Sequence, residues 1–256
     1  VGARDAASTP SGHAWETTVA ADRSPTVLVL DAMGVMYDKG NLVQAHLIPF
    51  ARDNGSRLPD RDILGHYLQC SAGEMSSEAF WRELGVTGEG DALDTAYVAR
   101  HRLVEGLISF LAWTRTSGTR VVCLSNDVAE WSVRLRRLHG LEAYIDHWTI
   151  SGDVKSRKPS VGIYRCLLDA TGLRAEECLF VDDKAPNLDV ARELGFHTCL
   201  FAPSRPGAVA RDSMRDAAFR DFQLGSSRAE GSAHPVARNF GDVRALLTGD
   251  AGDGAA

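Results

Sequence analysis

Polar side chains that could serve a catalytic site stand at four places in the sequence. Three of these places come at the end of a short apolar run, and the fourth opens a predicted helix. The side chains comprise a lone carboxylate, a hydroxyl and amide pair, an ammonium and a carboxylate pair: Asp31, Ser125, Asn126, Lys158, Asp182 and Asp183. A single Asp after an apolar run is more often a turn or cap residue than a functional one. Four such groups in one chain instead indicate a site with acidic, cationic and hydrogen-bonding chemistry.

The elements that must position these groups alternate along the chain. Short apolar or β-branched runs predict strands at 27–30, 120–124, 147–151, 178–182 and 197–201. Helices are predicted near 104–116, 127–139, 160–171 and 186–194, and Gly195 is a suitable helix stop. This alternation favours an α/β fold, with a doubly wound parallel sheet covered by helices on both faces. Ligands bind beyond the carboxyl ends of such strands, so we expect the polar groups to meet there.

Residues 42–103 carry helical rather than strand periodicity. Val43, Leu47 and Phe50 mark one apolar helix face, and Ser76 or Ser77 is placed to cap a helix that contains Phe80, Trp81 and Leu84. We therefore expect a small helical domain at 42–103, between core segments at 25–41 and 104–202. Polar, unpatterned sequence predicts a disordered tail at 1–24 and a long surface excursion at 203–238, partly helical near 209–221. A final helix and tail are expected at 239–256.

Composition excludes several classes of protein. The net charge of −6 gives no sign of a general nucleic-acid or membrane binder. Five dispersed Cys without a CxxC pair argue against a disulfide framework or a zinc site. No apolar run approaches the ~18 residues of a membrane span, and the first residues lack the pattern of a signal peptide. We expect a cytoplasmic protein, a monomer or homodimer, that acts on a small molecule.

Four segments of the sequence resemble motifs of the haloacid dehalogenase (HAD) superfamily. They are "VLVLDAMGV", "VVCLSN", "RKPSVGIY" and "LFVDDKAPNLDVARELGF", which fall in the superfamily's order and cover most of 27–201. The resemblance implies a Rossmannoid hydrolase core of subfamily IA type. The helical insert at 42–103 is similar to the superfamily's C1 cap domain, which would set the choice of substrate.

The resemblance also implies a role for each motif residue. Asp31 would be the nucleophile that forms a covalent intermediate. Ser125 would donate a hydrogen bond to a transferring phosphoryl oxygen, and Asn126 would help to position the substrate. Lys158 would neutralise charge between nucleophile and phosphoryl group; it is preferred to Lys155 because Pro159 follows it, as in the motif.

The carboxylate pair is expected to hold a metal. By the same resemblance, Asp182 and Asp183 would bind Mg²⁺ together with Asp31 and the backbone carbonyl of Met33, since this ion prefers hard oxygen ligands. Asn187 would either orient one of these ligands or cap the following helix. The implied substrate is a small phosphorylated molecule.

Met33 departs from the pattern. Phosphatases of the superfamily usually carry a second Asp at this position, which protonates the leaving oxygen and then activates water. A thioether can do neither at useful strength, and a general acid–base contributes about 10² to 10⁴ in rate. The activity is therefore expected to favour good leaving groups, such as acyl phosphates, phosphoanhydrides or phosphonates, or to take its acid from the cap. The cap candidates are His46, His66, Glu74, Glu78 and His101.

Two other functions are compatible with Met33 at the position of the usual second Asp. A dehalogenase needs no proton on its leaving halide, but the dehalogenases that the sequence resembles use no metal and lack the pair Asp182-Asp183. A binding or regulatory module with weakened catalysis would also lose the acid–base residue, although here the other motif residues are retained.

Overall fold

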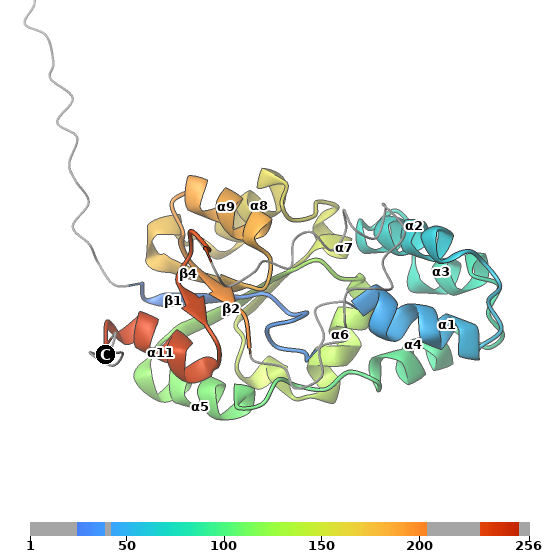
Figure 1. Ribbon diagram of the computed structural model, residues 1–256, viewed down its shortest axis with the longest axis horizontal. Coiled ribbons are helices and arrows are strands. Elements are labelled where there is room, and N and C mark those ends of the chain that lie inside the picture. The colour runs from blue at the N-terminus through green and yellow to red at the C-terminus, as the bar shows by residue number, and fades with distance from the viewer. Residues whose placement is uncertain (1–24, 39–41, 204–230, 251–256) are drawn as a thin grey trace, which may run out of the picture.

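The computed structural model describes residues 25–38, 42–203 and 231–250, and its centre is a six-stranded parallel sheet (Figure 1). The strands lie in the order β3-β2-β1-β4-β5-β6. Their bounds are β1 Val27–Leu30, β2 Arg120–Ser125, β3 His147–Ile150, β4 Cys178–Asp182, β5 His197–Phe201 and β6 Val236–Ala237. The chain builds β2 and β3 on one side of β1 and then crosses over to β4 on the other side. The direction of winding therefore reverses between β1 and β4, the point where ligands bind in open α/β sheets.

Helices cover both faces of the sheet, which confirms the predicted fold class. Helices α8 (Val161–Thr171) and α9 (Ala185–Glu193) lie on one face, and α5 (Leu107–Ser117) and α11 (Phe240–Thr248) lie on the other (Figure 1). Strand β1 serves both cores because successive side chains point to opposite faces. Leu28 and Leu30 pack in the core with α5 and α11, whereas Val27 and Val29 pack in the core with α8 and α9.

Residues 42–98 form a helical body beside the carboxyl-end side of the sheet (Figure 1). Its segments are η1 Val43–Leu47, α1 Ile48–Asp53, α2 Asp60–Ser71, α3 Ser77–Glu83 and α4 Gly90–Val98. Ser76 is the N-cap of α3, where its side chain accepts a hydrogen bond from the Ala79 N–H. This body lies within the helical insert expected at 42–103, and we use the word cap for that insert below.

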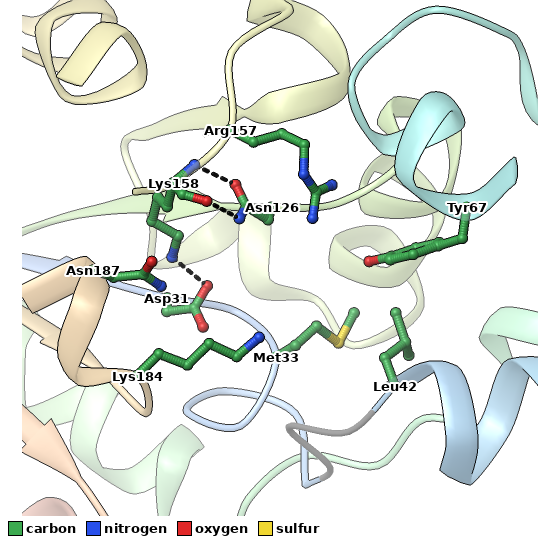
Figure 2. Close-up of a pocket in the computed structure, with 9 residues that line it drawn as sticks. All are labelled: Asp31, Met33, Leu42, Tyr67, Asn126, Arg157, Lys158, Lys184 and Asn187. Carbon is green, nitrogen blue, oxygen red and sulfur yellow. Dashed lines mark hydrogen bonds and ion pairs between the residues drawn. The ribbon is translucent and has the colours of Figure 1, made fainter. Parts of the chain in front are cut away.

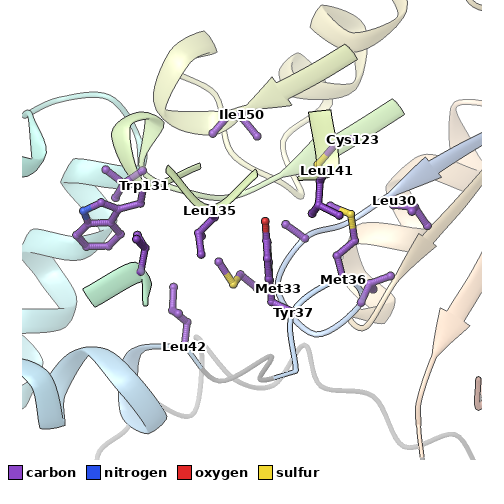
Figure 3. Packing of buried hydrophobic residues seen from close by; sticks show 14 of the residues in the cluster. Leu30, Met33, Met36, Tyr37, Leu42, Cys123, Trp131, Leu135, Leu141 and Ile150 are labelled. Carbon is purple, nitrogen blue, oxygen red and sulfur yellow. The ribbon is translucent and has the colours of Figure 1, made fainter. Parts of the chain in front are cut away.

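The cap is packed onto α6 (Ala129–Leu138) of the core domain. The ring centroids of Trp131 on α6 and Tyr97 on α4 are 4.5 Å apart. The buried carboxylate of Asp94 accepts hydrogen bonds from the indole N–H groups of Trp81 at 2.7 Å and Trp131 at 2.5 Å. Trp131 therefore anchors the cap to the core, and the apolar cores of the two domains form one continuous cluster (Figure 3).

A second contact joins the cap to α7 (Ser151–Val154), the short helix that precedes the segment with Lys158. The hydroxyl of Ser151 donates to the Ser71 carbonyl at 2.5 Å. Next to this bond, Gly73 approaches so closely that a Cβ built on it would lie 2.3 Å from the Gly152 carbonyl oxygen. The end of α2 and the start of α7 are thus joined by a side-chain to backbone hydrogen bond, and their backbones are in close contact at Gly73 and Gly152.

The sequence analysis was wrong at the end of the predicted surface excursion. Within 203–238, residues 236–237 form β6, which pairs with β5 through Leu200 and Phe201, and Ala237 is fully buried. A two-residue strand is too short to show a period, so the polar sequence around it concealed it. Residues 204–230, including the predicted helix near 209–221, and the predicted tail at 1–24 lie outside the described residues.

None of the helices in the described ranges has the length and apolar character that a bilayer crossing requires.

Candidate active site

The carboxyl ends of β1 and β4 bring the predicted nucleophile and metal ligands together. Leu30 pairs with Val181, and the backbone N–H of Asp31 donates to the Val181 carbonyl at 2.9 Å. Asp31 and Asp182 therefore leave the sheet side by side. With Asp183, they place one carboxylate oxygen each within 4.8 Å of the other two.

Lys158 lies between two of these carboxylates. Its ammonium donates to Asp31 Oδ1 at 2.8 Å, to Asp182 Oδ2 at 2.7 Å and to the Leu124 carbonyl at 2.8 Å (Figure 2). Burial by itself would lower the pKa of this amine, but the charges of Asp182 and Asp31 outweigh burial and raise it. Lys158 is therefore a buried cation. Lys155, in contrast, is an exposed residue at the end of α7.

Asp182 has more hydrogen-bond support than Asp31. The Asn187 amide donates to both of its oxygens at 3.0 Å, and the Lys184 N–H donates to Oδ1 at 2.8 Å. Asn187 lies inside α9, and Lys184 is the N-cap residue of that helix. Of the two roles expected for Asn187, the geometry thus supports orientation of a carboxylate.

The carboxylates carry more negative charge than Lys158 can balance. Burial raises the pKa of Asp31, and the neighbouring Asp182 raises it further, although Lys158 acts in the opposite direction. Burial also raises the pKa of Asp183 to about 7. Oδ1 of Asp183 is shielded from solvent and has no hydrogen-bond partner among the described residues. A cluster of hard oxygens with unbalanced charge and an unsatisfied carboxylate oxygen fits a divalent cation such as Mg²⁺. A contribution from the Met33 carbonyl stays a prediction.

The polar pair at the end of β2 occupies two different environments. The Asn126 side chain holds the backbone of Lys158 from both sides: its amide donates to the Lys158 carbonyl at 2.9 Å, and its oxygen accepts from the Lys158 N–H at 2.8 Å. This contact fixes the segment that carries the buried ammonium. Ser125 is fully buried, and its hydroxyl has no partner among the described residues. Its predicted hydrogen bond to a phosphoryl oxygen stays untested.

The pocket over Asp31 is a cavity of about 30 Å³ (Figure 2). It is lined by Asp31, Met33, Leu42, Tyr67, Asn126, Arg157, Lys158, Lys184 and Asn187. The cap contributes an apolar and an aromatic side chain, Leu42 and Tyr67. None of the five cap residues considered as a substitute acid lines this pocket. The wall between Asp31 and the cap is formed by the Met33 thioether (Figure 2).

Sequence reasoning missed four of the lining residues: Leu42, Tyr67, Arg157 and Lys184. Arg157 and Lys184 adjoin motif residues in the sequence, and that adjacency was the one signal that could have found them. Leu42 and Tyr67 carry no such signal, because a helix-spaced apolar residue is more often part of a core. Their place in the pocket depends on how the cap packs.

The model of the haloacid dehalogenase-like hydrolase family matches residues 26–195. The chain belongs to this family of hydrolases. The match covers all of the motif residues discussed above, from Asp31 to Asn187.

Curated relatives match part of the chain. The GMP/IMP nucleotidase YrfG of Escherichia coli (strain K12) is 28% identical over 134 residues, which cover 52% of this chain and 60% of the relative. A phosphoglycolate phosphatase of Nitrosococcus oceani is 29% identical over 119 residues, which cover 46% and 52% of the two chains. The chain thus spans between half and two thirds of these relatives' lengths.

Solved structures share the fold. A HAD family enzyme, BT-2542 of Bacteroides thetaiotaomicron, has a TM-score of 0.59 at 22% identity, with 71% of this chain and 95% of that one covered. An L-2-haloacid dehalogenase of Xanthobacter autotrophicus has a TM-score of 0.61 at 19% identity, with 89% and 100% covered. A structure of BT-2542 was determined in complex with magnesium and inorganic phosphate.

Proposed function

We propose that this protein is a Mg²⁺-dependent phosphohydrolase that transfers a phosphoryl group from a small metabolite with a good leaving group, through Asp31, to water. The observation that carries the proposal is the buried ammonium of Lys158 between Asp31 and Asp182, at a pocket that Met33 also lines. The curated nucleotidase and phosphoglycolate phosphatase relatives support phosphoryl chemistry.

Two displacements make up the reaction. A carboxylate oxygen of Asp31 bonds to phosphorus while the bond from phosphorus to the leaving oxygen breaks, and the bonding electrons depart with the leaving group. Water then attacks the aspartyl phosphate, which restores the Asp31 carboxylate and releases inorganic phosphate. Throughout, Lys158 offsets negative charge beside the nucleophile.

The three clustered carboxylates, from Asp31, Asp182 and Asp183, would hold the Mg²⁺ ion. Bound there, the ion would offset the charge of the phosphoryl oxygens. Asn187 and the Lys184 N–H keep Asp182 in position for this role, since they hold both of its oxygens.

Met33 sets the class of leaving group. A thioether has no proton to give, and no acidic or imidazole side chain of the cap lines the pocket. An acyl phosphate or phosphoanhydride releases a weakly basic leaving group that needs no proton, whereas an alkoxide leaving group does. We therefore place activated phosphoryl compounds ahead of alkyl phosphate esters.

Two alternatives share the motif set. The dehalogenase relative has the same fold, and Met33 suits a halide leaving group, but the cluster of Asp31, Asp182 and Asp183 favours a metal-dependent reaction. A catalytically weakened binding module is also compatible with Met33. Tight binding of Mg²⁺ and phosphate without turnover of any substrate would support that module.

The test is Mg²⁺-dependent phosphate release from acyl phosphates and phosphoanhydrides, compared with sugar and alkyl phosphate esters, with Asp31→Asn as control. Release from the activated compounds that is lost in the variant is the expected result. Chloride release from haloacids without Mg²⁺, or unchanged turnover by Asp31→Asn, would overturn the proposal.

A further inference from the structure

Arg157 lines the pocket, although neither the motif roles nor the reaction above employ it. It precedes Lys158, and the two side chains diverge: Lys158 extends to Asp31, and Arg157 extends towards the cap residue Tyr67 (Figure 2). The guanidinium carbon lies 5.9 Å from the centroid of the Tyr67 ring. One of its terminal nitrogens donates to the Ser71 hydroxyl, also in the cap.

The charge of Arg157 is not matched by an acidic partner. Among the described residues, no carboxylate lies within ion-pair distance of its guanidinium. The other described arginines without such a partner are all exposed to solvent: Arg57, Arg82, Arg102, Arg115, Arg165, Arg238 and Arg244. Arg157 is only partly exposed, so water compensates its charge less well.

Asp127, the nearby acid, does not supply the missing charge. Its carboxylate accepts a hydrogen bond from the Val128 N–H. Burial raises the pKa of Asp127 to about 7, although the charge of Arg157 opposes the shift. The carboxylate of Asp127 also lies beyond ion-pair distance of the Arg157 guanidinium, so Arg157 has no acidic partner among the described residues.

Contacts with the cap hold Arg157 in place. Besides the bond to the Ser71 hydroxyl, the Ser71 carbonyl accepts from Ser151, at the start of the segment that leads to Arg157. A guanidinium has five N–H donors in a planar fork that matches a carboxylate. The contact with Ser71 uses one of them, and the structure gives the other side-chain donors no partner among the described residues.

We propose that Arg157 binds a carboxylate on the substrate, at the opposite end of the pocket from the phosphoryl group held at Asp31. The substrate class is then a small phosphorylated carboxylic acid, because the cavity is small. Lys158 would then lie beside the phosphoryl group that reacts, and Arg157 would bind the carboxylate by which the substrate is recognised. This inference rests on the proposed function, which places the phosphoryl group at Asp31.

The test is equilibrium binding of two matched phosphonates to the Mg²⁺-loaded protein, measured by calorimetry. Phosphonopropanoate carries a carboxylate, and propylphosphonate carries a methyl group in its place; neither has an activated bond to phosphorus. The wild-type protein should bind phosphonopropanoate roughly tenfold to a hundredfold more tightly, the range of charge-assisted hydrogen bonds. Arg157→Met should remove most of this preference, and Arg157→Lys should retain part of it. Arg165→Met, at an exposed site outside the pocket, should retain all of it.

Equal binding of the two phosphonates by the wild-type protein would overturn the inference, as would a preference that survives in Arg157→Met or binding of neither compound. Phosphate release tests the proposed function separately. If hydrolysis fails while the preference depends on Arg157, the proposed function falls and the carboxylate site stands. If hydrolysis succeeds without a preference, the carboxylate site falls alone.

Discussion

The ammonium of Lys158 lies 2.8 Å from Oδ1 of Asp31, and its side chain is 1% exposed. The same ammonium also pairs with Asp182 at 2.7 Å. One buried cation thus serves both the proposed nucleophile and a proposed metal ligand. Its removal should affect catalysis, metal binding and stability together.

Lys158→Met should abolish most of the phosphohydrolase activity and destabilise the protein in the absence of Mg²⁺. Two buried carboxylates would lose their counter-charge, which costs about 3–5 kcal/mol when a buried ion pair is broken. Added Mg²⁺ should recover a larger part of the stability in this variant than in the wild type, because the ion replaces the lost positive charge. Urea unfolding with and without Mg²⁺ measures both effects. Equal stabilisation of the two proteins by Mg²⁺ would contradict this view of the site.

Met33→Asp should restore an acid–base group beside Asp31. Because general acid–base catalysis contributes about 10² to 10⁴ in rate, we expect kcat/KM for alkyl phosphate esters to rise at least about tenfold. The gain should be smaller for acyl phosphates, whose leaving groups need no proton. Steady-state phosphate release from both compound classes measures the ratio.

Met33→Asn is the matched control for that change, because it has the same shape as the Asp variant and no transferable acidic proton. It should leave the ester activity low. If the Asn and Asp variants gain equally, the effect comes from polarity or space at this position, and the account of Met33 fails.

Gly73→Ala should weaken the contact between α2 and α7. The new methyl group would lie 2.3 Å from the Gly152 carbonyl oxygen, at a residue with a φ of +73°. Gly85 is a matched control in the cap, since its φ is +64° and nothing lies within 4 Å of an added Cβ. The strain of the left-handed backbone costs roughly 1–2 kcal/mol at either site, and the clash should add about 1–3 kcal/mol at Gly73 alone. Equal free energies of unfolding for the two variants would show that this contact adjusts freely.

His101 should make the protein less stable in acid. Burial lowers the pKa of this imidazole to about 4 in the folded state, and the neighbouring His46 lowers it further. As the pH falls, the unfolded chain takes up a proton near pH 6.5 and the folded chain does so only near pH 4, so acid favours unfolding. The stability linked to His101 is present above pH 6.5 and is lost as the pH falls towards 4. Between pH 7 and 5 the loss amounts to about 2 kcal/mol.

His101→Phe keeps an aromatic ring against Tyr97 and removes the titrating group. The stability of this variant should fall less than that of the wild type between pH 7 and 5, and urea unfolding at the two pH values gives the difference. Parallel losses in the two proteins would show that other groups account for the acid sensitivity.

The central residues of the site could be predicted from the sequence because the parallel sheet determines where they lie. Asp31, Lys158 and Asp182 each follow a buried strand or open a helix, and parallel strands must bring such positions to one edge. The same logic could not find Arg157 as a pocket residue, since its position depends on Ser71, 86 residues earlier in the chain. Contacts between distant segments leave no local pattern.

The cap illustrates the same limit. Helical periodicity predicted its helices, yet His46 and His101, considered as substitutes for the missing acid, are stacked on each other at 4.9 Å outside the pocket. Periodicity identifies the buried face of a helix but not the neighbour that the face will contact. Strand β6 was missed for a different reason, because two residues are too few to reveal a period.

The most direct test of the central claim is to trap the covalent intermediate. The first displacement on an acyl phosphate needs no acid, whereas water attack on the aspartyl phosphate must proceed without a base at Met33, so the phosphorylated enzyme should accumulate. Rapid acid quenching during turnover of acetyl phosphate with Mg²⁺, followed by mass spectrometry, should find one phosphoryl group on the peptide that contains Asp31 and none in Asp31→Asn. Phosphate release without any phosphorylated Asp31 would contradict the proposed nucleophile.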